Sequence, residues 1–296
     1  MVNAVGLSRL LSLINPAFVR NFRVFDWDGS RILLEKAIEF PMLRGLDFTV
    51  FDISSDEEDQ LLESVMAQPW VKQLESLRLS GLERSGVWKL ACAATSLEEL
   101  ALPTCLNTEH HLTRLADIWR TAQDGRSPKL VDLDVGDAAQ DQYACVGRLF
   151  PRLHTLSCRV TAPACLLAPM TNLEELCIHE VSPVPTPLET AAALRALLTA
   201  CPNLKRLTLF ARWSAPYLPA MDNVFSSLPP TLEELSVAGI ALRASDFPNP
   251  LPLLHRAAFL HCGAESMPLV AQLRERSPHL KKVAVYCSAS GVRLRV

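Results

Sequence analysis

The stretch LTACPNLKRLTLF, residues 198–210, decides the fold of this chain. An apolar, helix-favouring run precedes Pro202, which breaks it because a proline inside a helix removes a hydrogen bond and clashes with the preceding turn. Leu204, Leu207 and Leu209 then follow at spacings of three and two. Residues two apart in a strand point to the same side, so Leu207 and Leu209 are expected to share a buried strand face. The stretch predicts a helix, a break and a strand.

The same arrangement recurs along the chain. Leu-x-x-Leu-x-Leu, with apolar substitutes, is found ten times at intervals of 20 to 33 residues. The ten copies are Leu43/Leu46/Phe48, Leu74/Leu77/Leu79, Leu97/Leu100/Leu102, Leu130/Leu133/Val135, Leu153/Leu156/Cys158, Leu173/Leu176/Ile178, Leu204/Leu207/Leu209, Leu232/Leu235/Val237, Leu254/Ala257/Phe259 and Leu280/Val283/Val285. Val19, Phe22 and Val24 form a degenerate eleventh copy. Several copies follow a proline in the same register, as in FPML, SPKL, FPRL, CPNL and SPHL. A period in this range predicts a repeat architecture.

One repeat cannot bury its own leucines. In the run 77–79, Leu77 and Leu79 point to one side of the strand and Arg78 to the other. Stacking the next repeat beside it places leucine against leucine and pairs the backbones about 4.7–4.9 Å apart. Parallel neighbours need a crossover connection, which a helix supplies. The fold class predicted is therefore an α/β solenoid shaped as a curved horseshoe, with parallel strands on its concave face and helices and irregular crossovers on its convex face.

Helix signals occupy the intervals between the strands. Ser55 and Glu58 form a capping box, and Thr186, Pro187 and Glu189 combine an N-cap, a proline at the first helical position and a second capping box. In the segment 108–122 the apolar residues share one helical face, namely Leu112, Leu115, Ile118 and Trp119. Another helix is expected within 264–277, and residues 161–170 are expected to form an extended or 3₁₀ link.

Composition and charge narrow the class of protein. The chain has 296 residues, of which 49% are hydrophobic, and this is ample apolar material for a large core. Its net charge of −3 argues against nucleic-acid binding. No run approaches 18 uninterrupted apolar residues and the N-terminus lacks a basic region, so we expect neither a membrane span nor a signal peptide. The nine cysteines form no C-x-x-C pair, which favours reduced thiols and a cytoplasmic or nuclear protein.

Three stretches carry a resemblance to a known family: MTNLEELCI (170–178), ACPNLKRLTLF (200–210) and PPTLEELSV (229–237). With them, the chain from Leu43 to Val285 resembles the leucine-rich repeat superfamily. It is most similar to the irregular helical type found behind the F-box of ubiquitin-ligase substrate-recognition subunits and in ribonuclease-inhibitor-like proteins. The family usually has Asn or Cys three residues after the last consensus leucine, where it bonds the turning backbone. Those positions hold Cys105, Cys262, Thr161, Ser288, Leu82, Val181, Arg212 and Ile240 here.

The resemblance implies a domain organisation and a function. Residues 1–40 would be an N-terminal helical cap or degenerate first repeat, and residues 41–296 a leucine-rich repeat domain of about ten irregular repeats. The expected function is non-catalytic binding of a protein partner on the concave face, as in the substrate-recognition part of an F-box-type ubiquitin ligase. The ligase core would then bind through a missing or divergent N-terminal module, because residues 1–40 show no Leu-Pro start of an F-box. A scaffold or cytoskeletal adaptor without a ubiquitin link and an α/β enzyme are the alternatives.

Candidate partner-binding residues flank the buried positions of the strands. Those expected on the concave face are Asp132, Asp134, Arg159, His179, Arg206, Phe210, Arg256, Lys282 and Tyr286. Trp213 and Tyr217, with Phe225, are aromatic residues of a proline-containing connection that suits a binding hot spot. Ordinary solvated strand positions, and aromatic residues folded back onto the helices, would give the same patterns.

The sequence indicates no catalytic or cofactor chemistry. Glycine-rich phosphate loops and zinc-ligand spacings are absent from it, so we expect no cofactor, no metal and no enzymatic activity. Two pairs of residues are the candidates for an exception. Cys177 and His179 share a strand face, as a nucleophile and its base would. Asp132 and Asp134 share another and could bind a cation, although two solvated carboxylates are the commoner outcome.

Overall fold

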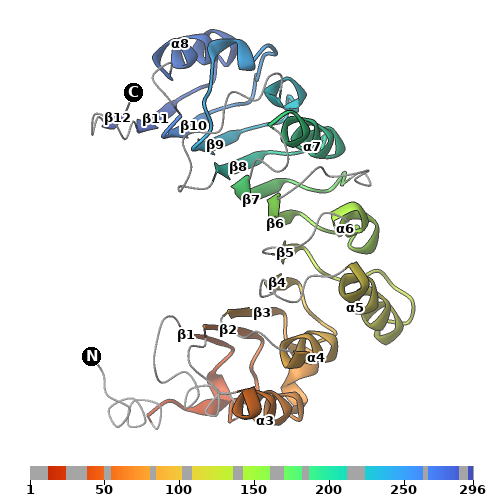
Figure 1. Cartoon of the computed structure of the whole chain (residues 1–296). Helices are drawn as coiled ribbons and strands as arrows, with labels where there is room; N and C mark the ends of the chain where they lie inside the picture. Colours follow the sequence, from red (N-terminus) through yellow and green to blue (C-terminus); the bar gives the residue numbers. More distant parts are fainter. Residues whose placement is uncertain are drawn as a thin grey trace. The chain divides into compact units, whose positions relative to one another are not determined.

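The structure, a computed structural model, describes residues 13–24, 39–49, 55–80, 85–101, 109–135, 143–160, 170–181, 187–211, 224–262, 266–286 and 293–295. The chain forms two compact units, Met1–Val135 and Gly136–Val296, called unit 1 and unit 2 below. Both are built in the same way, with strands in chain order on one side and helices on the other (Figure 1). Each unit is thus a solenoid-like α/β stack, as the repeat spacing predicts.

Unit 1 contains a parallel sheet in the order β1-β2-β3-β4-β5. Its strands are β1 (Asn21–Val24), β2 (Gly45–Thr49), β3 (Ser76–Ser80), β4 (Glu99–Ala101) and β5 (Asp132–Asp134). Its helices are α3 (Ser55–Met66), α4 (Ser85–Ala93) and α5 (Glu109–Ala122), with 3₁₀ turns η1 (Pro16–Phe18) and η2 (Pro69–Gln73). Phe22 of β1 pairs in register with Leu46 of β2, so the degenerate eleventh copy is a strand of this sheet.

Unit 2 contains the sheet β6-β7-β8-β9-β10-β11-β12. Its strands are β6 (Thr155–Val160), β7 (Glu175–Val181), β8 (Arg206–Ala211), β9 (Glu234–Ala238), β10 (Arg256–Leu260), β11 (Lys282–Tyr286) and β12 (Arg293–Arg295). Its helices are α6 (Tyr143–Leu149), α7 (Pro187–Ala200) and α8 (Ser266–Arg276), with 3₁₀ turns η5 (Val224–Ser227) and η6 (Ala244–Asp246).

The last strand departs from the expected all-parallel order. Strands β6 to β11 are parallel, but β12 pairs antiparallel with β11. The physical reason is chain length. Only the six residues 287–292 separate the two strands, and a parallel return needs a crossover of a dozen residues or more.

The consensus leucines form the predicted ladder. In unit 1 the second position of each repeat pairs in register as Leu46, Leu77, Leu100 and Leu133. In unit 2 the corresponding row is Leu156, Leu176, Leu207, Leu235, Ala257 and Val283. All of these side chains are at most 4% exposed. Each repeat therefore covers the apolar surface of its neighbour, and this burial is the main stabilising term of such a stack.

Where each strand begins, one backbone carbonyl of a repeat accepts hydrogen bonds from two N–H groups of the next repeat. The carbonyl oxygen of Glu174 accepts from the N–H groups of both Lys205 and Arg206, at 2.8 and 2.9 Å. The equivalent carbonyl accepts two N–H groups of the next repeat at Arg20, Arg44, Glu75, Glu98, His154, Lys205, Glu233 and His255. This repetition fixes the register of one strand on the next, because each start is bonded in the same way.

Side chains just before the first consensus leucine add a second link between repeats. The amide of Asn203 donates to the carbonyl of Thr171 at 2.7 Å, and that of Asn172 donates to Pro151 at 2.7 Å. Thr231 takes the same position one repeat later and donates to Pro202 at 3.2 Å. The Asn of the opening stretch therefore has a structural role that its hydrophobic pattern did not reveal.

The predicted helices are present where the structure describes them. On α5, Leu112, Leu115 and Trp119 are at most 1% exposed, and the Trp119 indole donates to the carbonyl of Ala91 at 3.1 Å. Helix α7 begins at Pro187, the predicted first position. Residues 161–169, where a short link was expected, lie outside the described residues. None of the described helices is both long and apolar enough to cross a membrane.

Candidate functional site

The strand side chains that point away from the buried leucines form one face of the sheet in each unit, which we call the open face. In unit 1 this face holds the candidate residues Asp132 and Asp134, both on β5. In unit 2 the candidates on the strands are Arg159, His179, Arg206, Phe210, Arg256, Lys282 and Tyr286. The structure describes the backbone of Arg159 but not its side chain, and Trp213 and Tyr217 lie outside the described residues.

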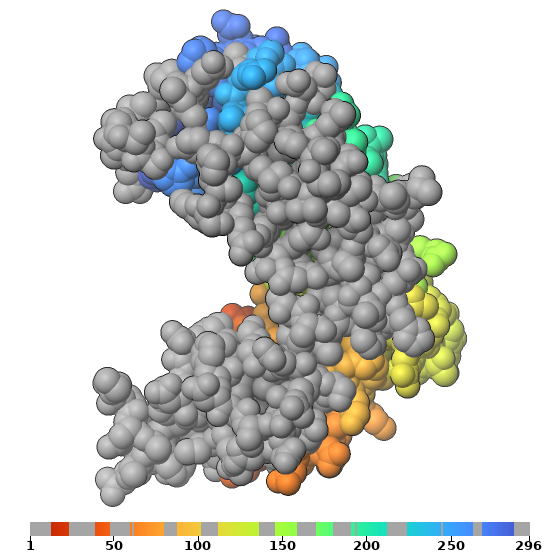
Figure 2. Space-filling view, in the orientation of Figure 1, coloured from red at the N-terminus to blue at the C-terminus, as the bar shows by residue number. Residues whose placement is uncertain are grey.

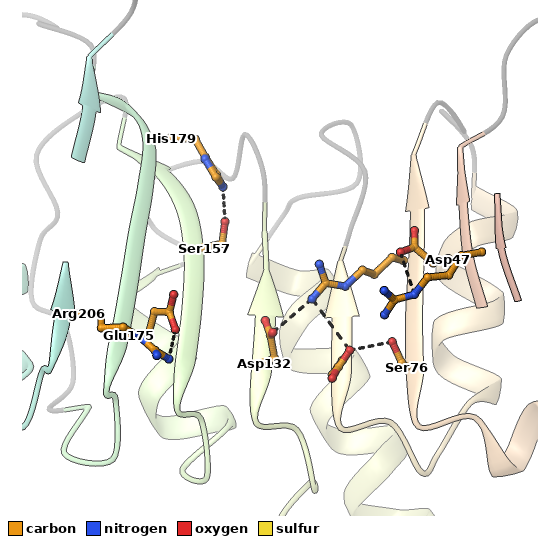
Figure 3. A network of polar contacts seen from close by, with 10 residues as sticks. Asp47, Ser76, Asp132, Ser157, Glu175, His179 and Arg206 are labelled. Carbon is orange, nitrogen blue, oxygen red and sulfur yellow. Dashed lines mark hydrogen bonds and ion pairs between the residues drawn. The ribbon is translucent and has the colours of Figure 1, made fainter. Parts of the chain in front are cut away.

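On the open face of unit 1, one arginine joins two strands across a third. The Arg78 guanidinium on β3 lies 3.3 Å from the Asp132 carboxylate on β5 and 4.0 Å from Glu99 on β4 (Figure 3). It can reach β5 because Ala101, its register partner on β4, carries only a methyl group. The hydroxyl of Ser76 donates to Glu99 at 2.9 Å. Asp132 is therefore held by a cationic side chain of its own sheet.

Among the residues that the structure describes, no group of three or more His, Cys, Asp or Glu side chains comes together in a way that could hold an ion. Five cysteines have side chains that the structure describes, and none of them is in a disulfide: Cys92, Cys158, Cys177, Cys201 and Cys262.

On the open face of unit 2, charges alternate along the row where the strands begin. The register places Glu175, Arg206, Glu234, Arg256 and Lys282 side by side. Glu175 pairs with Arg206 (Figure 3). Glu234 pairs with Arg256 at 3.1 Å. Two cations therefore stand next to each other at the end of the row, and no described carboxylate pairs with Lys282.

The residues one position before this row also make polar contacts on the surface. The Lys205 ammonium is 2.9 Å from the Glu174 carboxylate, and this hydrogen bond holds the pKa of Glu174 below its usual range. His255 Nε2 lies 3.5 Å from the Glu234 carboxylate, which Arg256 also contacts. Exposed pairs of this kind add little to stability because water and salt screen them, so they orient side chains more than they stabilise the fold.

A groove of about 550 Å³ lies on this face across β9, β10 and β11. Its outward floor consists of Ser236, Ala258 and Ala284, which are register partners. One side of the groove is lined by Glu234, Arg256 and Lys282. The next outward row along the same strands is Ala238, Leu260 and Tyr286. The groove exists because three successive repeats place a small residue at the same position.

A polar cluster lies elsewhere on the open face of unit 2. The Nε2 atom of His179 is 2.6 Å from the Ser157 hydroxyl (Figure 3). The Nδ1 atom of the same ring is 3.7 Å from the Cys177 thiol. The sequence suggested the pair Cys177 and His179 but missed Ser157, which comes from the neighbouring strand. The sequence does contain a signal for Ser157, because an alignment of the repeats places this residue beside Cys177.

One loop aromatic residue proves to be a core residue. The sequence pattern groups Phe225 with the binding-loop candidates Trp213 and Tyr217. In the structure, however, Phe225 lies in η5, is 3% exposed and stacks on Phe247 with ring centroids 4.7 Å apart. Folding back onto the core is therefore the correct interpretation for Phe225.

Helix α5 lies at the surface of unit 1, where its residues are coloured yellow in Figure 2. A hollow of about 540 Å³ lies along this helix. The lining residues that the structure describes all come from this helix, namely Thr113, Arg114, Asp117, Ile118, Thr121 and Ala122. Groups from a single helix do not converge on a point in the way that ligand pockets require. The groove on β9 to β11 is the better candidate site.

Comparison with known proteins gives the chain no family assignment. No protein-family model and no curated protein matches it. Among solved structures, a Bacteroides fragilis protein determined by the Northeast Structural Genomics Consortium is similar, with a TM-score of 0.47 and 14% identity over 82% of this chain and 74% of that one. A likeness of this size carries no argument about function, so the fold description rests on the strand order, the register and the buried leucines of this chain.

Proposed function

We propose that the chain is a leucine-rich repeat protein. The period, the shared carbonyl at each strand start and the buried leucine rows support this assignment. Cys262 adds a local support, since it stands where the family usually has Asn or Cys. Its thiol donates to the carbonyls of Val237 at 3.3 Å and Leu260 at 3.4 Å, and it is 2% exposed. It thus bonds the backbone just after the strand, next to His261, whose φ is 54°.

We further propose that the protein is a non-catalytic binding module and that the open face of unit 2 takes a protein partner. The observation that carries this proposal is the groove on β9 to β11 beside Lys282. Its floor of small side chains lets a partner backbone approach closely. Among the lining residues that the structure describes, the cations Arg256 and Lys282 outnumber the one acidic residue, Glu234. Complementary charge of this kind steers and orients a partner.

The occupant that fits best is an extended segment of an acidic protein surface. A carboxylate of that segment would face Lys282, and apolar side chains would lie over the row of Leu260 and Tyr286, which are half-buried. This row is typical of a contact surface, because aromatic and aliphatic residues beside a charge often supply the binding energy of an interface.

Two substitutions test the site directly. Lys282→Glu reverses the charge at the end of the groove, and Ala258→Trp fills its floor. Arg274→Glu is the matched control, because Arg274 is an exposed cation on α8. In affinity purification with quantitative mass spectrometry, both groove variants should lose partners that the wild type and the control retain. Equal capture by all four proteins would reject the groove as the binding site.

The ubiquitin-ligase form of the proposal rests on the sequence resemblance. It requires a cullin-type ligase core among the proteins that co-purify with the wild type. Partners without such a core would instead support the scaffold or adaptor form. Nucleotide binding or hydrolase activity in the purified protein would favour the enzyme alternative.

A further inference from the structure

We propose that Cys177 is a reactive thiol that exchanges with small disulfides such as oxidised glutathione, and that His179 accepts the proton of this thiol. The inference goes beyond partner binding and does not depend on it. It rests on a chain of three side chains on the open face of unit 2. The Ser157 hydroxyl lies 2.6 Å from Nε2 of His179, and the Cys177 sulfur lies 3.7 Å from Nδ1 of the same ring.

Each nitrogen of the His179 ring has its own partner. In the tautomer with the proton on Nε2, that N–H donates to Ser157 and Nδ1 accepts from the S–H of Cys177. When the thiol proton moves to Nδ1, the sulfur becomes a thiolate that accepts from Nδ1–H. Ser157 accepts from Nε2–H before and after the transfer, so it holds the ring in one orientation. Ser157 is therefore a positioning residue.

The reaction balances without a further oxidant. The Cys177 thiolate attacks one sulfur of the disulfide, a new S–S bond forms and the old S–S bond breaks. The leaving thiolate takes the proton from the protonated His179 ring. The products are a mixed disulfide on Cys177, one free small thiol and a neutral ring ready for the reverse reaction.

The described neighbours of Cys177 on the two flanking strands are compatible with a small disulfide. Cys177 is half-buried, and its register partners on the two flanking strands are Ser157 and Thr208, both small and uncharged. Apart from His179 itself, the charged residues on the same face of β6, β7 and β8 whose side chains the structure describes are Glu175 and Arg206; Arg159 on β6 is described by its backbone alone. Glu175 and Arg206 pair with each other, so no unpaired acidic group among them repels the glutathione carboxylates.

The other described thiols are poor competitors. Cys158, Cys201 and Cys262 are at most 2% exposed. Burial raises the pKa of Cys92 to about 11, so this thiol is protonated at neutral pH. Thiolates and not thiols attack disulfides. Of these five cysteines, Cys177 is expected to react first.

The experiment uses the full chain, fully reduced and then exposed to oxidised glutathione at pH 7. Peptide mapping by mass spectrometry follows the occupancy of each cysteine with time. Cys177 should be modified at least about tenfold faster than Cys92, and His179→Gln should slow Cys177 about tenfold, because the thiolate fraction sets the rate. Ser157→Ala should slow it by a smaller factor. Thr208→Ala, the matched control on the other flanking strand, should leave the rate unchanged.

The pH dependence separates a proton acceptor from a merely structural neighbour. Below about pH 8, an unassisted thiol loses about tenfold in rate per pH unit. The wild-type rate at Cys177 should fall much less between pH 8 and 6.5, whereas the rate in His179→Gln should fall steeply. Circular dichroism of each variant checks that it is folded. The proposal is overturned if folded His179→Gln matches the wild type in rate and pH profile, or if Cys177 reacts no faster than Cys92.

Discussion

The indole Nε1 of Trp119 on α5 donates a hydrogen bond of 3.1 Å to the backbone carbonyl of Ala91 on α4. Both residues are fully buried, so this bond joins the helices of two successive repeats inside the core of unit 1. The sequence placed Trp119 on the apolar face of its helix but did not show that the polar edge of the ring has a partner there.

Two substitutions of Trp119 separate the energy of this hydrogen bond from the energy of side-chain packing. Trp119→Phe keeps most of the apolar volume but leaves the Ala91 carbonyl without its donor, and we expect it to cost about 1–3 kcal/mol. Trp119→Ala also empties a large site and should cost about 3–5 kcal/mol. Equilibrium denaturation measures both. Equal losses in the two variants would mean that the hydrogen bond, and not the ring volume, dominates.

The leucine ladder predicts a large loss on truncation of a central rung. Leu207 lies in register between Leu176 and Leu235, and all three are at most 1% exposed. Leu207→Ala should therefore lower the free energy of unfolding by about 2–5 kcal/mol. Thr208→Ala is the control, because Thr208 is the next residue of the same strand and faces outward. A similar small loss in both variants would contradict the ladder.

Substitutions of Cys262 test whether its hydrogen bonds after β10 are those of a leucine-rich repeat. Cys262→Ala removes the donor to the carbonyls of Val237 and Leu260, and it should cost about 1–2 kcal/mol. Cys262→Asn supplies the other donor typical of the family and should recover part of that loss. An Asn variant less stable than the Ala variant would show that this turn is specific to a thiol. Thermal and denaturant unfolding give the comparison.

At Gly239, both the backbone conformation and the lack of space disfavour a side chain. Its φ is 71°, and an added Cβ would lie 3.1 Å from the Ala211 side chain and 3.3 Å from the Ala211 carbonyl oxygen. Gly125 has a similar φ of 78° but open space around it, so it is a matched control. Gly125→Ala should cost about 1–2 kcal/mol for the left-handed conformation alone, and Gly239→Ala should cost more. Equal losses of stability in the two variants would mean that Ala211 moves aside at little energetic cost.

Cys201 should make the stability of the fold pH-dependent in alkali. Burial raises the pKa of this thiol from 9.0 to about 12. Between these values the unfolded chain has lost the proton and the folded chain retains it, so folding stability falls as pH rises. One such group contributes a slope of up to about 1.4 kcal/mol per pH unit. Below pH 9 it contributes no slope.

The measurement compares the wild type with Cys201→Ala under reducing conditions at pH 8, 9 and 10. The variant is expected to be less stable at pH 8, because a buried side chain is lost. The gap should then narrow as pH rises, because only the wild type carries the ionisation penalty of Cys201. A constant gap across this range would show that Cys201 can ionise in the folded protein.

The fold followed from the sequence because its signals are local. Alternating apolar residues define a strand and apolar residues three or four apart define a helix face, so Leu207 and Leu115 could each be assigned from a few neighbours. The antiparallel pairing of β12 also has a local cause, the short connection of residues 287–292. The residues Arg293–Arg295, however, carry no sequence pattern that predicts a strand.

The candidate site followed from the sequence only in part. The outward positions of Arg256 and Lys282 were predictable from alternation. Their unequal pairing, with Arg256 held by Glu234 at 3.1 Å, depends on side-chain geometry between strands. The groove depends on Ser236, Ala258 and Ala284 coming into one row, which requires the register of three repeats.

By itself, the sequence determined the repeat, its strand, its buried leucines and the identity of the outward side chains. Only the tertiary structure decided which outward side chains meet: Arg78 with Asp132, 54 residues apart, and Ser157 with His179, 22 residues apart. The reason is physical. Strand and helix patterns reflect the geometry of a single segment, whereas a contact between repeats depends on strand register, on crossovers of unequal length and on the small residues that let a long side chain pass.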